Sequence, residues 1–470
     1  MPGGRFEVYG YDGSRWLIDS VHESLAAAIG RCEELAADHR ALFETVQVID
    51  QEKFANRRAV VHEQARARGK GTPVQIQPIS EVSHCERLID YYMLQARLVV
   101  CRLLRGFLDD ERITALELMH DYTRLRRLMR DDRLYPKALS HVATLQAKAE
   151  GTTPQQRMDA IDKAVERIVQ RAKTTHEYGE LGEIIEHHGV DAAYASLPKD
   201  YGQLRKRVEV AGAVARHLRP HAEWTDKLDV LLAMVPGAKS RATLGILDEA
   251  VAEILDNPAA VDEIIGTYIE VSDKLLARIR LARGRWHDPE ADADARDVGE
   301  RLSAQLATGK WTHAPDVLMR QVAKTLKSTQ PLRRNEREAK DAFARIVRAL
   351  HGVGGLAGGP DMADAVTQRA RRVEATGPED LPPESGVTEV MRRLSPRSAQ
   401  LGYLLSLAAS EFGVRYRSVM IKMLTAALKG LSDRDSLLDA GGSRADTQRM
   451  IRELQERLDA LEAGEASVSQ

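Results

Sequence analysis

Two histidines and two glutamates have the spacing that a helical metal site would need: His176, Glu180, Glu183 and His187. Steps of four, three and four residues place these side chains along one face of a helix, and imidazole and carboxylate groups are common zinc ligands. Leu181 and Ile185 occupy another face, so the pattern also fits the solvated side of an ordinary helix. Gly179 and Gly182 weaken that helix. We therefore predict no metal and no cofactor, and keep this row as the alternative candidate.

A glycine-rich stretch beginning at His351 follows an expected amphipathic helix over 341–350. It resembles the motif of histidine phosphotransfer proteins, in which a histidine exposed on a four-helix bundle accepts a phosphoryl group from a receiver aspartate. Gly355 and Ala357 match the glycine and small positions, whereas Gly354 stands where the family has lysine. The resemblance implies a phosphorelay component with His351 as the catalytic residue. The interpretation that we favour is a helix ending in a glycine-rich connector, with His351 near the helix C-terminus.

Signatures of other catalytic sites are missing from the sequence. No Lys-Ser or Lys-Thr pair follows the glycines as in a phosphate-binding loop, and the glycine pattern lacks the strand and helix of a dinucleotide site. We therefore predict no catalytic constellation and expect a protein that is not an enzyme.

Basic residues collect in the segment 56–82 among glycines and prolines: Arg57, Arg58, Arg66, Arg68 and Lys70. Such a cluster can contact the phosphates of a nucleic acid. The formal net charge of −2, the pI of about 6.7 and the lack of interleaved aromatic residues favour a solvated tether instead. Nucleic-acid binding through this linker is therefore the further alternative.

The composition indicates a helical protein with several domains. The chain has 470 residues, of which 43% are hydrophobic, 29% charged and only 5% aromatic, so the cores must use Leu, Ile, Val, Ala and Met. Three distant cysteines without a Cys-x-x-Cys pair favour a reducing cytoplasm. The absence of an apolar leader or long apolar run predicts neither export by a signal peptide nor a transmembrane segment. The preference for Arg over Lys suggests a GC-rich bacterial genome.

The N-terminus is the part of the sequence that alternates like a β-sheet. Segments 5–9 and 15–19 flank Asp12-Gly13, a dipeptide typical of hairpin turns. Ser20 and Glu23 have the spacing of a capping box before a helix, and a third strand follows around Val46. The sequence predicts a small ββαβ module over 1–55, whose open sheet edges can accept a partner strand.

The rest of the chain reads as a multi-helix bundle or irregular helical array. We expect a helical body, subdivided near 285, a Pro/Gly linker and a C-terminal helical unit: 83–375, 376–386 and 387–440. Two similar junctions, Gly284-Arg285-Trp286 and Gly309-Lys310-Trp311, suggest helices that end on a left-handed glycine, with the Trp packed back onto the last turn.

The last helix, expected over 443–463, carries apolar residues at steps of three and four: Ile451, Leu454, Leu458 and Leu461. This is the seam of a short coiled coil, which would make a homo-oligomer. The alternative is a helix docked on its own chain, because two heptads are marginal in isolation. We expect a cytoplasmic scaffold, adaptor or regulatory protein that binds other proteins through the N-terminal module and C-terminal helices.

Overall fold

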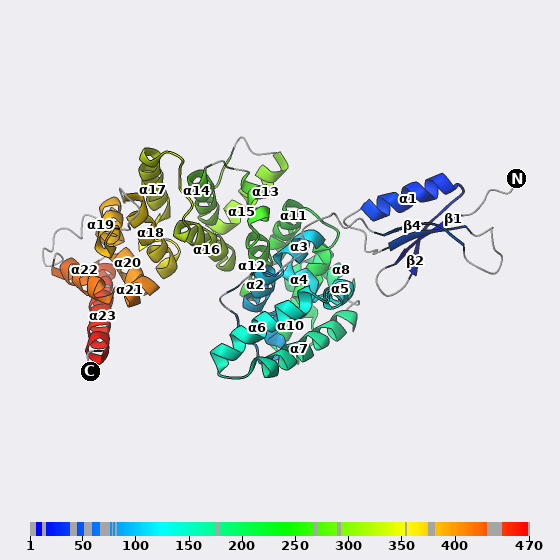
Figure 1. The fold of residues 1–470 in the computed structure, drawn as a ribbon, viewed down its shortest axis with the longest axis horizontal. Coiled ribbons are helices and arrows are strands. Elements are labelled where there is room, and N and C mark those ends of the chain that lie inside the picture. The colour runs from blue at the N-terminus through cyan, green and yellow to red at the C-terminus, as the bar shows by residue number, and fades with distance from the viewer. Residues whose placement is uncertain are drawn as a thin grey trace. The chain divides into compact units, whose positions relative to one another are not determined.

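The computed structural model describes residues 6–11, 16–37, 45–50, 59–65, 76–77, 79, 82–174, 179–266, 268, 270–288, 293–352, 355–374, 381–395, 397–429 and 444–468. Most of these residues lie in helices, and a small sheet lies at the N-terminus (Figure 1). This confirms the predicted mainly α fold with a small N-terminal α+β module. The chain divides into two compact units, Met1–Asn257 and Pro258–Gln470.

The N-terminal sheet is antiparallel, with strand order β2-β1-β3-β4. Its strands and its helix are β1 (Phe6–Tyr11), β2 (Trp16–His22), α1 (Leu25–Ala37), β3 (Thr45–Asp50) and β4 (Ala59–Ala65). Helix α1 covers one face of the sheet, where Val8, Val46 and Val48 pack against Ala28 and Cys32 (Figure 1). Strands β2 and β4 form the two edges.

The fourth strand differs from the ββαβ prediction, because β4 lies in the segment 56–82 that the sequence suggested as a linker. The module is therefore ββαββ among the described residues. The basic and glycine-rich stretches on both sides of Ala59–Ala65 hide this strand in the sequence. In the structure, β4 pairs with β3 along its length and covers one of the edges that the prediction left open.

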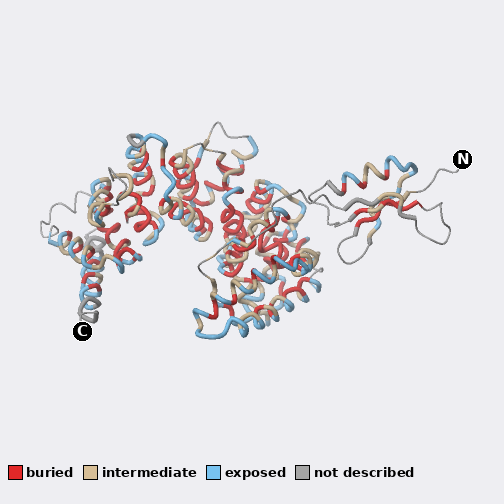
Figure 2. The backbone as a smooth tube through the Cα atoms, viewed as in Figure 1, coloured by how far each residue is buried: buried red, intermediate tan, exposed pale blue. Residues whose placement is uncertain are grey.

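The remaining helices of the first unit form an α-helical array: η1 (Leu88–Tyr92), α2 (Leu94–Leu103), α3 (Arg105–Glu111), α4 (Ala115–Met119), α5 (Tyr122–Met129), α6 (Leu134–Glu150), α7 (Pro154–Thr174), α8 (Gly179–His188), α9 (Val190–Ser196), α10 (Gln203–Leu218), α11 (Trp224–Met234), η3 (Val235–Gly237) and α12 (Arg241–Leu255). Figure 2 shows their buried faces in red. Helices α6 and α7 form a hairpin. Gly151, with a φ of 69°, ends α6 in the left-handed conformation, and Pro154 begins α7.

The second unit consists of helices and one two-residue hairpin: α13 (Pro258–Ile265), α14 (Val271–Ala282), α15 (Ala293–Ala307), α16 (His313–Lys327), α17 (Glu336–Leu350), β5 (His351–Gly352), β6 (Gly355–Leu356), α18 (Gly359–Glu374), α19 (Pro383–Arg393), α20 (Arg397–Ala408), α21 (Glu411–Arg415), α22 (Arg417–Lys429) and α23 (Arg444–Val468). Helix α18 lies beside α16, and α14 contacts both α16 and α17.

The segment 376–386, expected to isolate the C-terminal helices, joins helices that pack on each other. Helix α19 begins inside this segment at Pro383 and packs against α18, which also contacts α20. The hydroxyl groups of Thr367 and Tyr403 are 2.6 Å apart in the buried space between α18 and α20. The C-terminal helices therefore continue the second unit.

Candidate interaction surface

Among the described residues, strand β2 has a neighbouring strand on one side only, and it carries two exposed apolar side chains. Ile18 is 56% exposed and Val21 is 43% exposed. Their spacing of three residues would normally place them on opposite faces of a sheet. The register shows a bulge, because Tyr9 pairs with Ile18 whereas Val8 pairs with Ser20. The extra residue restores Ile18 and Val21 to the same face.

That face is the one that α1 does not cover. Val8 belongs to the core beneath α1, so its neighbours Glu7 and Tyr9 point to the opposite face. Val21 pairs with Glu7, and Ile18 pairs with Tyr9. Paired residues of antiparallel strands share a face, so Ile18 and Val21 lie with Tyr9 on the side opposite α1. Tyr9 is buried there, whereas Ile18 and Val21 on the edge strand are exposed. An exposed edge strand with apolar side chains is a template for a further strand.

Contacts with α1 hold the bulge of β2 in place. Asp19, the bulged residue, accepts hydrogen bonds from Arg31 Nε at 3.0 Å and Arg31 Nη2 at 3.2 Å. Burial by itself would raise the pKa of Asp19, but the Arg31 guanidinium and the Ser20 hydroxyl lower it below its usual value. Asp19 therefore stays ionised, and the pair positions β2 against α1.

The start of α1 differs from the predicted capping box. Ser20 lies within β2, where its hydroxyl is 2.9 Å from His22 Nε2. The hydroxyl of Ser24 instead accepts a hydrogen bond from the backbone N–H of Ala27 at 3.2 Å. Ser24 therefore performs the capping that the sequence suggested for Ser20.

The predicted metal row does not form a site among the described residues. Glu180, Glu183 and His187 are exposed on α8, while Gly182 and Ile185 face the interior. His176 lies outside the described ranges. Where the structure describes the chain, it shows no group of three or more His, Cys, Asp or Glu arranged to hold a metal ion. The three described members of the row lie on the solvated face of α8.

His351 does not have the helical position that the phosphotransfer resemblance requires. Helix α17 ends at Leu350, and His351 begins the two-residue strand β5, where it pairs with Leu356. Its Nε2 atom is buried, and its carbonyl accepts a hydrogen bond from Arg283 Nη1 at 2.5 Å. His351 therefore lies in a short hairpin after the helix and not on it, and the phosphotransfer alternative stays a prediction.

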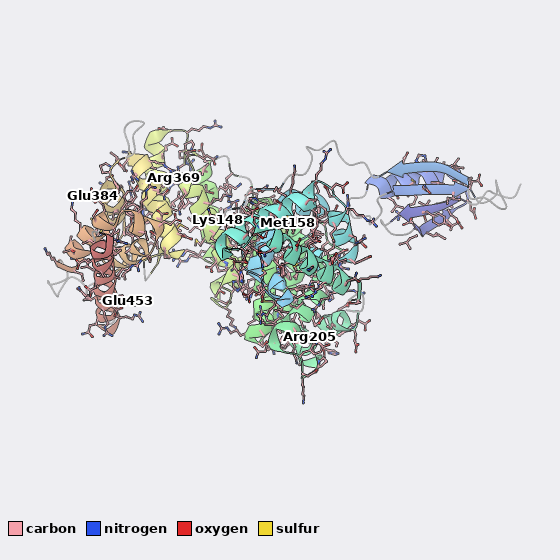
Figure 3. The ribbon with its side chains drawn as sticks, turned by 60° about the horizontal axis from the view of Figure 1, so that its bottom comes forward. Lys148, Met158, Arg205, Arg369, Glu384 and Glu453 are labelled. Carbon is pink, nitrogen blue, oxygen red and sulfur yellow. The ribbon has the colours of Figure 1, made fainter. Side chains whose placement is uncertain are left out.

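The basic linker residues Arg57, Arg58, Arg66, Arg68 and Lys70 lie outside the described ranges, so nucleic-acid binding through them stays a prediction. Other basic residues of the chain have internal roles. Arg369 on α18, labelled in Figure 3, is buried and donates hydrogen bonds to carbonyls at the end of α16. Arg372 Nη1 donates to the carbonyl of Lys327 there, at 2.9 Å. These side chains satisfy a helix C-terminus and are not a phosphate site.

The seam of the last helix is covered by its own chain. Leu454, Leu458 and Leu461 are buried, and α23 packs against α20 and α22. Ile451 is half-buried. Arg457 also donates a hydrogen bond to the carbonyl of Ala408 at the end of α20, at 2.6 Å. These contacts fit the alternative of a helix docked on its own chain, and a homo-oligomer through this helix stays a prediction.

The three cysteines are inaccessible in the folded protein. Cys32, Cys85 and Cys101 are all buried and form no disulfide, and burial raises the pKa of the Cys85 and Cys101 thiols. No helix in the described ranges is long and apolar enough to cross a membrane.

No known protein family, curated protein or solved structure matches this chain.

Proposed function

We propose that the protein is an adaptor or regulatory protein that binds a partner through the edge strand β2 of its N-terminal sheet. The observation that carries the proposal is the pair Ile18 and Val21, exposed side by side on edge strand β2. The partner is an extended segment of another protein, which would add a strand to β2. Backbone hydrogen bonds would supply affinity, and apolar contacts with Ile18 and Val21 would supply specificity.

The exposure of Ile18 and Val21 is a fixed feature of the folded module and does not require a conformational change. The bulge that turns Ile18 and Val21 to one face is fixed by the ion pair between Asp19 and Arg31. Edge strands that are not used for binding are commonly protected by charged side chains directed along the open face. Here the side chains of Ile18 and Val21 on that face are apolar.

The test compares proteins retained by the tagged full chain and by two double variants. Ile18→Lys with Val21→Lys places two charges on the proposed surface. Ala26→Lys with Ala27→Lys adds the same charges to the exposed side of α1. We expect a partner retained by the natural chain and the α1 control to be lost from the β2 variant. Hydrogen exchange of the complex should show protection of β2 amides.

A folding control accompanies this comparison. All three proteins should have the same far-UV circular dichroism spectrum, because Ile18 and Val21 are exposed and contribute little to the core. Retention of the same partners by all three proteins, or protection confined to helices, would refute binding through β2.

A further inference from the structure

Helices of the first unit line an apolar pocket of about 150 Å³ that is partly open to solvent and has no part in the proposed sheet interaction. Its wall is built from α2, α4, α5, α6 and α7. Representative lining residues from these helices are Val100, Leu118, Leu125, Val142 and Ile161. The pocket therefore lies within the helical array, between segments that are distant in sequence.

The polar groups in the pocket wall already have partners within the protein. The amide of Gln146 donates to the carbonyl of Ser83 at 2.6 Å and accepts from Arg157 Nη2 at 2.5 Å. The hydroxyl of Tyr135 donates to Asp162 at 2.7 Å. Burial raises the pKa of the Cys85 thiol to about 11, so this thiol stays protonated and neutral. The wall presents a neutral surface to an occupant.

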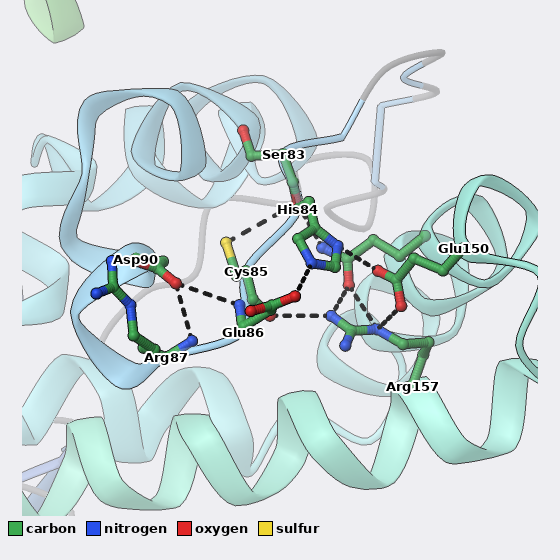
Figure 4. A network of polar contacts seen from close by, with 9 residues as sticks. Ser83, His84, Cys85, Glu86, Arg87, Asp90, Glu150 and Arg157 are labelled. Atoms are coloured by element: carbon green, nitrogen blue, oxygen red, sulfur yellow. Dashed lines mark hydrogen bonds and ion pairs between the residues drawn. The ribbon is translucent and has the colours of Figure 1, made fainter.

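A polar network holds one end of the pocket together (Figure 4). His84 Nδ1 lies 2.7 Å from Glu150 at the end of α6, and Arg157 of α7 lies 3.4 Å from the same carboxylate. Arg157 also donates to the carbonyl of Cys85 at 3.2 Å. These contacts tie the segment 83–86 to both helices of the α6–α7 hairpin, so this end cannot close by a simple loop movement.

Buried ion pairs hold helices α2 and α4, which form part of the pocket wall. Arg97 of α2 lies 2.7 Å from Glu253 of α12, and Glu253 accepts a hydrogen bond from the backbone N–H of Leu116 at 2.8 Å. Helices α2 and α4 thus carry buried polar anchors on one side and pocket-lining side chains such as Val100 and Leu118 on the other. The anchors oppose collapse of the two helices into the pocket, because moving them would leave buried charges unpaired.

We propose that this pocket is a binding site for a small, neutral, apolar molecule with about the dimensions of one aromatic ring. An engineered cavity of about 150 Å³ in another protein, lined by aliphatic and aromatic side chains, stays dry and binds benzene or xenon. A water molecule needs about two to four polar partners, and the groups named above are engaged elsewhere. A charged or strongly polar ligand would lose its hydration without replacement. The volume is too small for a peptide helix.

Benzene is the probe for this site. In the full chain, we expect benzene to raise the melting temperature in a saturable manner and to perturb the methyl resonances of pocket residues. Ala138→Leu fills the pocket from α6, and Ala96→Leu fills it from α2. Each should weaken benzene binding by roughly tenfold or more, since either side chain occupies the ligand's space. Ala149→Leu is the matched control, because Ala149 is exposed on α6.

Phenol tests the chemical class, since its ring has the same size as benzene but carries a hydroxyl. We expect phenol to bind roughly tenfold more weakly than benzene, because entering an apolar pocket strips water from that hydroxyl. Absence of benzene binding by the natural chain would overturn the proposal. Benzene affinity in both filling variants equal to that of the natural chain, with unchanged circular dichroism, would also overturn it. Phenol binding as tight as benzene would refute the apolar class.

Discussion

Lys227 and Glu117 form an ion pair that is shielded from solvent on all sides. Lys227 Nζ in α11 lies 2.5 Å from Glu117 Oε1 in α4, and the two side chains are 0% and 1% exposed. Glu117 also accepts a hydrogen bond from the backbone N–H of Thr114, and Lys227 donates to the carbonyl of Leu218. The pair therefore connects the short helix α4 with α10 and α11.

Removing one member of this pair should lower the free energy of unfolding much more than removing both members. Lys227→Met leaves the Glu117 carboxylate buried without its cation, which costs about 3–5 kcal/mol. Adding Glu117→Gln removes the stranded charge and keeps an acceptor for Thr114, so the double variant should recover most of the stability. Chemical denaturation of the two single variants and the double variant gives the coupling free energy. Additive effects would contradict a mutually dependent pair.

Glu253 should make stability fall as the pH rises. Burial raises the pKa of Glu253 to about 7, although Arg97 and the Leu116 N–H act in the opposite direction. Because the folded-state pKa lies above the usual value of 4.5, the folded protein binds this proton more tightly than the unfolded chain. The contribution of Glu253 to the unfolding free energy therefore decreases between pH 4.5 and about 7.

The variant that isolates this contribution is Glu253→Gln, which keeps an acceptor for the Leu116 N–H but does not titrate. The natural chain should lose stability relative to this variant as the pH rises from 4.5 to about 7. His120, whose pKa burial lowers to about 3, titrates in both proteins and its effect cancels in the difference. Unfolding free energies measured across this range check the prediction, and a difference that does not vary with pH would contradict it.

Arg369 should be irreplaceable by lysine. Its guanidinium donates hydrogen bonds to the carbonyls of Leu326 and Gln330, each at 2.8 Å, and to that of Ser328 at 2.6 Å. A lysine ammonium cannot reproduce this planar set of donors. We expect Arg369→Lys to lower the unfolding free energy of the second unit by about 3 kcal/mol, since buried carbonyls lose their partners. Arg348→Lys, on the exposed side of α17, is the control and should change stability by less than about 0.5 kcal/mol.

The sequence predicts local structure well where one residue type determines the backbone. The Asp12-Gly13 signal correctly places strands β1 and β2 on either side. The alternation of side chains does not reveal the bulge at Asp19, so the shared face of Ile18 and Val21 emerges only from the register. Strand β4 is not predicted for a different reason. Basic residues flank it on both sides and glycines follow it, so the segment resembles a linker.

Local sequence patterns do not predict contacts between segments that are far apart in the sequence. Lys227 and Glu117 are 110 residues apart, and each reads as an ordinary polar residue of an amphipathic helix. The pocket has the same origin, since its wall combines five helices whose apolar stripes look like any core-facing stripe. The seam of α23 shows the limit most clearly, because Leu454 and Leu458 satisfy a coiled-coil pattern and a docked helix equally well.

The sequence correctly predicts a left-handed glycine at Gly284, and the structure adds a packing contact of Trp286 that the sequence did not indicate. Gly284 has a φ of 64°, and the hydrogen bonds from Gly284 N to Leu281 O and from Arg285 N to Arg280 O form a Schellman motif at the end of α14. The packing of Trp286 back onto α14 stays a prediction. Its ring lies against Gly299 of the following helix α15.

Gly284 and Gly309 should therefore respond differently to the same substitution. Both have positive φ angles, 64° and 67°, so alanine at either site costs about 1–2 kcal/mol of backbone strain. A Cβ at Gly284 would also lie 2.5 Å from the Cβ of Ala307, whereas at Gly309 it would meet open space. We expect Gly284→Ala to be more destabilising than Gly309→Ala by about 1–3 kcal/mol, because α14 and α15 must separate to admit the methyl group. Denaturant unfolding of the two variants measures this difference, and equal losses would show that the close approach of Gly284 to Ala307 does not limit the packing of these helices.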